Sequence, residues 1–156
     1  VDIADSSLLL TLNNIVEKYR VPESLLRLEI TESAYMDNPE QLITTVNRLR
    51  ESGFLVEMDD FGSGYSSLNM LKNVPVDVLK LDMQFIRSAF GGNRDTRLLE
   101  MMIDISHSLD IPTVAEGVED NEQLSALRKM GCDVVQGYCF SRPLPANEFE
   151  RFIVKK

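Results

Sequence analysis

Five short apolar segments alternate along the chain with segments of helical periodicity, and this alternation restricts the fold more than any other feature. The segments predicted to be strands are 25–30, 54–58, 76–81, 112–115 and 134–135. Between them, leucine, isoleucine and valine recur at the three- and four-residue spacing of helices that cover a sheet. Strands and helices in strict alternation predict β-α-β units and a parallel sheet of the α/β class.

Polar residues on one face of three strands distinguish between two parallel architectures. The alternating polar positions are Arg27, Glu29, Thr31, Glu57, Asp59, Lys80 and Asp82. An open doubly wound sheet has helices on both faces, so its strands are apolar on both. Polar side chains on one face instead favour the interior and mouth of a barrel. Because a β/α barrel needs about eight strands, the sequence predicts a partial (β/α)8, TIM-like barrel whose N-terminal strands lie upstream of Val1.

Composition and charge are typical of one globular domain and disfavour binding to DNA or to a membrane. The chain has 156 residues, 44% of them hydrophobic, and a net charge of −9, which disfavours binding to DNA. Cys132 and Cys139 are too few for a disulfide framework. No apolar run has the ~18 residues of a membrane span, and no signal peptide is present. The sequence therefore predicts a cytoplasmic domain without membrane contact, which is also compatible with the cytoplasmic part of a larger membrane-anchored protein.

Each predicted strand is followed or ended by a residue that can take part in chemistry. These residues are Glu29, Asp59 with Asp60, Lys80, Glu116 and Gln136. Successive members are one β-α-β repeat apart, so they should surround one end of the barrel. Carboxylate oxygens are ligands that Mg²⁺ and Mn²⁺ prefer, and a lysine among them could hold a water or stabilise charge on a phosphate. Singly, each residue also fits a structural role, but together they favour a functional site.

Five motifs resemble the EAL family of cyclic di-GMP phosphodiesterases and arrive in the family's order. They are Leu-Glu-Ile-Thr-Glu at 28–32, Asp-Asp-Phe-Gly-Ser-Gly-Tyr-Ser-Ser at 59–67, Lys-Leu-Asp at 80–82, Ala-Glu-Gly-Val-Glu at 115–119 and Gln-Gly-Tyr-Cys-Phe-Ser-Arg-Pro at 136–143. The resemblance covers nearly the whole chain. It implies a β/α barrel that uses two Mg²⁺ or Mn²⁺ ions to hydrolyse cyclic di-GMP to linear pGpG.

The same resemblance implies a role for each motif residue. The implied metal ligands are Glu29, Asp59 and Asp60, with Asp59 shared between the ions. The implied catalytic residues are Lys80 at the attacking water, Glu116 as base or metal-side ligand, and Gln136 as a group that positions water or metal. Asp60, Glu119 and Pro143 would bind substrate, the last two near the guanine side. Glu32 would brace the loop after Asp60, through which the family often forms homodimers.

The chain departs from the family pattern at its beginning. The Glu-Ala-Leu signature and the Asn-x-Ser motif, which carry two metal ligands in the family, are absent. Residues 1–156 are therefore expected to be an EAL-type domain truncated at its N-terminus. Its catalytic activity is expected to be impaired or lost in this fragment. The longer parent protein could carry an upstream sensor or diguanylate cyclase-like domain. The alternative is a non-catalytic cyclic di-GMP-binding, dimerisation or signalling module. A phospho-receiver domain is disfavoured, because its acid pair would lie at the first strand.

Overall fold

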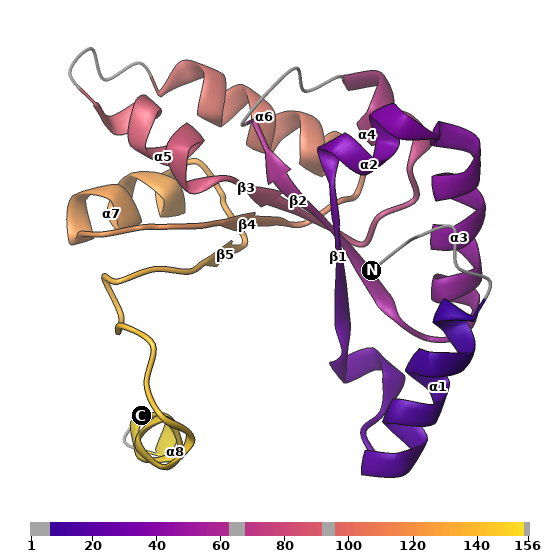
Figure 1. Cartoon of the computed structure of the whole chain (residues 1–156). Helices are drawn as coiled ribbons and strands as arrows, with labels where there is room; N and C mark the ends of the chain where they lie inside the picture. The colour runs from indigo at the N-terminus through magenta and orange to yellow at the C-terminus, as the bar shows by residue number, and fades with distance from the viewer. Residues whose placement is uncertain (1–6, 63–67, 92–95, 155–156) are drawn as a thin grey trace.

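The computed structural model describes residues 7–62, 68–91 and 96–154 and contains one five-stranded parallel sheet (Figure 1). Its strands are β1 (Arg27–Thr31), β2 (Leu55–Phe61), β3 (Val78–Leu81), β4 (Thr113–Ala115) and β5 (Val134–Val135). They lie in the order β1-β2-β3-β4-β5. Sequential order is that of a β/α barrel, whereas a doubly wound sheet reverses its order at a switch point. Among the described residues β1 and β5 do not pair, which confirms the predicted partial barrel.

Helices precede, connect and follow the strands, and side-chain caps explain where several of them begin. They are α1 (Leu8–Tyr19), α2 (Glu32–Asp37), α3 (Pro39–Glu51), α4 (Leu68–Asn73), α5 (Met83–Phe90), α6 (Arg97–Ser108), α7 (Asn121–Lys129) and α8 (Ala146–Val154). Asn38 accepts a hydrogen bond from the Gln41 N–H at the start of α3, and Asp120 accepts one from the Gln123 N–H at the start of α7. The sequence pattern does not predict α2 or α5.

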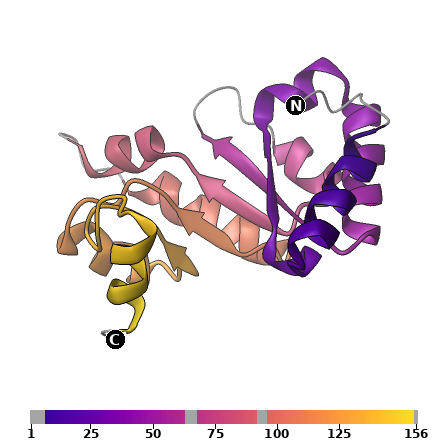
Figure 2. The same ribbon diagram turned by 60° about the horizontal axis from the view of Figure 1, so that its bottom comes forward.

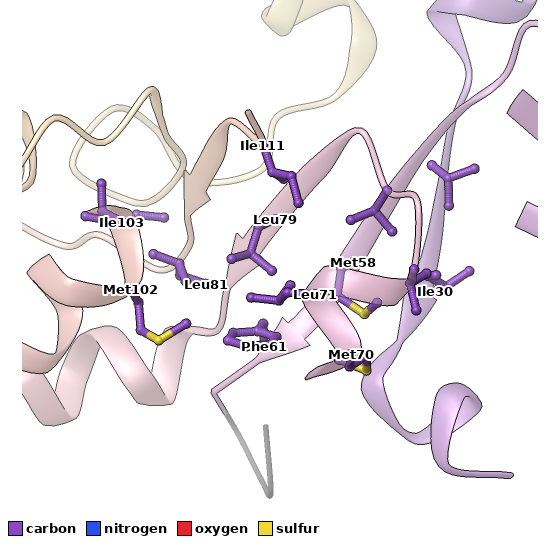
Figure 3. Close-up of a cluster of buried hydrophobic side chains, with 14 of the residues drawn as sticks. Ile30, Met58, Phe61, Met70, Leu71, Leu79, Leu81, Met102, Ile103 and Ile111 are labelled. Carbon is purple, nitrogen blue, oxygen red and sulfur yellow. The ribbon is translucent and has the colours of Figure 1, made fainter. Parts of the chain in front are cut away.

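The core lies between the sheet and the helices that cover one of its faces. Figure 3 shows strand residues Ile30, Met58 and Leu79 close to Met70 and Leu71 of α4. Each such buried side chain contributes roughly 2 kcal/mol by its removal from water. The other face carries the polar residues that the sequence places there, and Arg27 of β1 pairs with the buried Glu57 of β2. The sheet therefore has an apolar face covered by helices and a polar face, as expected for the wall of a barrel.

Apolar surface borders both open edges of the sheet. A recess of about 510 Å³ lies along β1 and is lined by Leu8, Leu12 and Leu28, among other residues. Beyond β5, an extended segment leads to α8, which lies apart from the sheet and has no buried residue (Figures 1 and 2). An exposed sheet edge has unpaired main-chain groups, so it can pair with a strand of another segment or another molecule.

Two aspartates fasten the end of the sheet opposite the acidic strand ends. Asp77 precedes β3, and its Oδ2 accepts a hydrogen bond from the Val56 N–H of β2 at 2.8 Å. Asp133 precedes β5, and its Oδ2 accepts one from the Thr113 N–H of β4, also at 2.8 Å. The same device therefore occurs at two β-α-β repeats and holds neighbouring strands in register.

Asp133→Asn is expected to destabilise the fold by about 1–2 kcal/mol at neutral pH, since charge-assisted hydrogen bonds are lost. Asp133 Oδ2 also lies 3.1 Å from Thr113 Oγ1 and 2.9 Å from His107 Nε2. Burial raises the pKa of Asp133, but hydrogen bonds from Thr113 and His107 outweigh burial and hold it below its ordinary 3.8. The stabilisation is thus present above pH 3.8 and is lost as pH falls through the folded-state pKa.

Urea unfolding of wild type and Asp133→Asn at neutral and strongly acidic pH tests this account. The difference in unfolding free energy should shrink in acid. Asp104→Asn removes an exposed carboxylate of α6 and serves as the control. An Asp133→Asn deficit that stays constant between the two pH values would show that the charge of Asp133 is unimportant.

Candidate active site

Lys80 is the centre of the acidic cluster at the C-terminal ends of the strands. Its Nζ lies 2.5 Å from Glu29 Oε1 of β1, 2.9 Å from Asp59 Oδ1 of β2 and 2.9 Å from Glu116 Oε1 beyond β4. The Lys80 side chain is only 8% exposed. Because β1 to β4 are parallel neighbours, residues distant in sequence meet at one end of the sheet. The structure thus brings together four of the predicted site residues.

The electrostatic environment keeps Lys80 charged. Burial by itself lowers the pKa of an ammonium. Interactions with Glu29, Asp59 and Glu116 outweigh burial, and the pKa of Lys80 lies above its ordinary value of 10.5. Lys80 is therefore a fixed positive charge at neutral pH and cannot accept a proton from a substrate or a water.

A β-bulge explains how two consecutive aspartates can face the same region. In a regular strand, neighbouring side chains point to opposite faces. The β2–β3 register shifts between Met58 and Phe61, and Asp60 has a φ of 58°, in the left-handed region. Asp60 is exposed, and partial removal from water together with the charges of Asp59 and Asp82, in that order, raises its pKa. Strand β2 therefore includes the acid pair, and the bulge brings Asp60 into the electrostatic field of the cluster.

The donor set suits a divalent cation in its chemistry. Glu29, Asp59 and Asp60 present hard carboxylate oxygens beside one another in the fold. Asp59 Oδ1 is buried and forms an ion pair with the Lys80 ammonium at 2.9 Å, but it has no hydrogen-bond partner among the described residues. Within those same residues, no three acidic, histidine or cysteine side chains have metal-ligand spacing. The cluster thus offers oxygen atoms suited to a divalent cation. In this structure the positive charge beside these oxygen atoms comes from the Lys80 ammonium.

Main-chain hydrogen bonds join the two loops that carry Glu116 and Gln136. The Gln136 N–H donates to the Ala115 carbonyl at 2.8 Å, and the Val118 N–H donates to the Gln136 carbonyl at 3.1 Å. A Cβ added at Gly137 would lie 2.1 Å from the Val118 carbonyl oxygen and 2.4 Å from its nitrogen. Glycine at position 137 is therefore what allows the loops after β4 and β5 to approach.

Gly137→Ala is expected to destabilise the fold by roughly 2 kcal/mol, because the added methyl group forces two backbone segments apart. Gly131→Ala provides the comparison: its added Cβ would meet no atom closer than His107 Cε1 at 3.7 Å, so only the cost of its φ of 84° applies. Urea denaturation of both variants measures the difference. A smaller loss for Gly137→Ala than for Gly131→Ala would contradict the close approach.

A pocket of about 430 Å³ extends from the acidic cluster between α5 and the loops after β4 and β5. It is lined by Asp82, Met83, Arg87, Glu116, Gly117, Glu119, Gln136, Gly137 and Tyr138. Glu119 pairs with Arg87 at 2.6 Å, and Glu116 belongs to both the pocket and the cluster. The predicted residues Glu116, Glu119 and Gln136 therefore share one pocket.

Two other predicted residues lie elsewhere. Pro143 lines a neighbouring apolar recess of about 480 Å³ together with Tyr138 and Phe149. Glu32 begins α2 and is only 9% exposed. Most of the loop that Glu32 is predicted to brace, residues 63–67, lies outside the described residues. Its bracing role and the dimer that depends on this loop stay predictions.

Arg87 lines the pocket of about 430 Å³, although the sequence pattern alone does not single it out. Asp82, which the sequence places in the polar alternation and in the Lys-Leu-Asp motif, directly follows β3 and caps α5 by accepting a hydrogen bond from the Gln84 N–H at 2.7 Å. That cap sets the face of α5 on which Met83 and Arg87 lie, four residues apart. The available signal was an aspartate before a short amphipathic segment, which predicts a helix start.

Comparison with known proteins identifies relatives across the whole chain. The EAL domain profile matches residues 2–143. NbdA of Pseudomonas aeruginosa, named a cyclic di-GMP phosphodiesterase, is 41% identical over 152 residues, which are 97% of this chain and 19% of NbdA. This chain thus spans about a fifth of the length of the curated relatives it matches.

Solved structures agree in fold. The PaMucR phosphodiesterase, in complex with c-di-GMP, has a TM-score of 0.87 at 33% identity, covering 94% of this chain and 60% of that one. The EAL domain of Mycobacterium smegmatis DcpA has a TM-score of 0.89 at 32% identity, covering 97% of this chain and 68% of that one. Together with the sequence profile and the parallel sheet, these matches show that the chain belongs to the EAL domain family.

Proposed function

We propose that this chain is part of a phosphodiesterase domain that hydrolyses cyclic di-GMP to linear pGpG. The observation that carries the proposal is the convergence of Glu29, Asp59 and Glu116 on the buried Lys80 at the strand ends. Chemistry in β/α barrels takes place at this end. The name of NbdA and the ligand of PaMucR support the choice of substrate.

Divalent metal is part of the proposal, with Mg²⁺ or Mn²⁺ as the ions and two ions in the working site. Glu29, Asp59 and Asp60 would hold them, and the buried Asp59 Oδ1 without a hydrogen-bond partner among the described residues suits a shared ligand. A bound divalent ion would make water a better nucleophile and offset phosphate charge. Local cations are needed because the chain has a net charge of −9 and the substrate is an anion.

The chain's own residues have separate roles in the proposed reaction. Lys80, permanently charged, donates hydrogen bonds to the attacking water or to a phosphate oxygen. Glu116 accepts the proton of that water, whose oxygen bonds to phosphorus while the bond from phosphorus to the ribose 3′ oxygen breaks. The leaving 3′ oxygen takes up a proton from solvent and becomes the 3′ hydroxyl of pGpG. Gln136 orients the water from the adjoining loop. Roles of this kind require Glu116 to be near Lys80, where the structure has it.

Partners and location complete the proposal. The proposed partners are a second copy of the chain, bound through the loop after β2, and an upstream sensor or diguanylate cyclase-like domain. The second of these agrees with a chain that spans about a fifth of NbdA. No helix among the residues described is long and apolar enough to cross a membrane. We place the domain in the cytoplasm, where cyclic di-GMP is made and degraded.

A second function is favoured by one observation. The Lys80 ammonium already contacts three carboxylates, and no three ligands have metal spacing in the described part of the chain. An arrangement neutralised in this way could bind cyclic di-GMP and transmit a signal without hydrolysing it. This module is the alternative to the enzyme.

Two measurements separate the two functions. Cyclic di-GMP is titrated into the protein by calorimetry in the presence of Mn²⁺, and the nucleotides are then analysed by chromatography. Saturable binding with accumulation of pGpG supports the phosphodiesterase. Saturable binding with cyclic di-GMP recovered intact supports the binding module. Absence of both binding and cleavage would contradict the proposed function.

A further inference from the structure

A second ion pair lies on the polar face of the sheet, beside the acidic cluster. The Arg27 guanidinium on β1 binds Glu57 Oε1 on β2 through Nη1. The Glu57 side chain is only 7% exposed, whereas that of Arg27 is 53% exposed. Burial of a carboxylate is costly unless a cation or hydrogen-bond donors compensate it. Arg27 therefore compensates a buried charge that takes no part in the proposed reaction.

The register of the strands places Glu57 within reach of Lys80. Strands β1, β2 and β3 lie side by side (Figure 1), and Glu57 is the Cα partner of Glu29 on one side and of Val78 on the other. Because Val78 precedes Lys80 by two residues, Glu57 and Lys80 point to the same face, with Cα atoms about 8 Å apart. The contact of Lys80 Nζ with Glu29 Oε1, at 2.5 Å, joins β3 to β1 and so crosses β2 beside Glu57.

Lys80 nevertheless does not pair with Glu57 in the part of the chain that the structure describes. Its ammonium contacts Glu29, Asp59 and Glu116 of the acidic cluster. A lysine ammonium has three donors on a flexible stem, so it can turn towards any carboxylate within its reach. What distinguishes Glu57 from the three carboxylates of the cluster is its pairing with an arginine.

We propose that Arg27 is a positioning residue of the candidate active site. By binding Glu57, it keeps this carboxylate from drawing the Lys80 ammonium away from the strand ends. Without Arg27, Glu57 would be a buried charge that water screens poorly, and Lys80 is the cation nearest to it along the register. Lys80 would then leave the position from which it is proposed to act. The placement of Lys80 does not depend on the proposed function, whereas the effect on hydrolysis rests on it.

The position of Lys80 can be observed directly by nuclear magnetic resonance. A chain labelled with ¹³C at lysine gives a signal for the Lys80 ε-methylene group, which is assigned by its absence in Lys80→Met. Arg27→Met should shift this signal, because Glu57 then competes for the ammonium. The double variant Arg27→Met/Glu57→Gln should return it to the wild-type position, because glutamine has no charge. An ion pair that served stability alone would leave the signal unmoved in every folded variant.

Arg27→Gln keeps a neutral hydrogen-bond donor for Glu57 and is the milder substitution. It should shift the Lys80 signal in the same direction as Arg27→Met, but less. This variant keeps the inference testable if the buried charge prevents Arg27→Met from folding. Arg50→Met is the matched control, because Arg50 pairs with Asp77 at 2.9 Å near the opposite end of the sheet. It should leave the Lys80 signal and the rate of hydrolysis unchanged.

The rate of pGpG release from cyclic di-GMP in a single turnover measures the consequence for the reaction. Arg27→Met should be about a hundredfold slower than wild type, a loss that a displacement of roughly 1 Å can cause. The double variant should regain most of the rate.

Three outcomes would overturn the inference: an unmoved Lys80 signal in the folded Arg27 variants, a double variant with the same shift as Arg27→Met, or a shifted signal with an unchanged rate. A shift in Arg27→Met that the double variant reverses, in a chain whose wild type releases no pGpG, would retain the placement of Lys80 by Arg27. That result would contradict the proposed function.

Discussion

Lys80→Met is expected to lower the free energy of unfolding by about 3 kcal/mol at neutral pH, because it leaves neighbouring carboxylates without their shared cation. Asp59 and Glu116 have side chains that are 18% and 21% exposed, so water screens their repulsion poorly. Glu29 is 51% exposed, which places the loss at the low end of the range for buried ion pairs. Methionine is unbranched like lysine and only one atom shorter, so packing changes little.

Urea denaturation across a pH series measures this effect, with Lys72→Met on the exposed surface of α4 as control. The pKa of Lys80 is raised in the folded state, so its stabilisation is complete below its ordinary 10.5 and is lost as pH rises through the folded-state pKa. The deficit of Lys80→Met should therefore stay undiminished from neutral pH up to 10.5. Added Mg²⁺ should restore part of the stability. A variant as stable as wild type at neutral pH would contradict the central role of Lys80.

Much of the fold follows from side-chain alternation that is visible in the sequence. Arg27 and Glu29 alternate with Leu28 and Ile30, and this one-sided polarity distinguishes a barrel from an open sheet before any strand order is known. Helix α5 was harder to predict, because Asp82 is the single residue between β3 and α5 and caps the helix directly after the strand. Local patterns are weakest where two elements follow each other without a loop.

The strand-end residues of the site could also be predicted, since parallel strands bring their carboxyl ends together. Two features could not. The left-handed conformation of Asp60 and the register shift in β2 depend on packing against β3. The pairing of Arg87 with Glu119 joins residues 32 positions apart and follows no periodic pattern. Both are long-range consequences of the fold.

Asp59→Asn is expected to slow hydrolysis of cyclic di-GMP about a thousandfold, because one carboxylate serves both the proposed metal site and Lys80. Asparagine has the shape of aspartate but lacks its charge, so the backbone should be little affected. Asp104→Asn, which removes a carboxylate from the exposed face of α6, should leave the rate unchanged. Circular dichroism of both variants confirms that the fold is retained.

The release of pGpG under single-turnover conditions, with the chain in excess over cyclic di-GMP, tests the central claim most directly because slow hydrolysis remains measurable. The account predicts that wild type and Asp104→Asn form pGpG in Mn²⁺ or Mg²⁺ and form none in EDTA. It also predicts that Asp59→Asn forms pGpG about a thousandfold more slowly than wild type. Equal rates for Asp59→Asn and wild type, or equal rates with metal and with EDTA, would contradict a metal-dependent phosphodiesterase site at these strand ends.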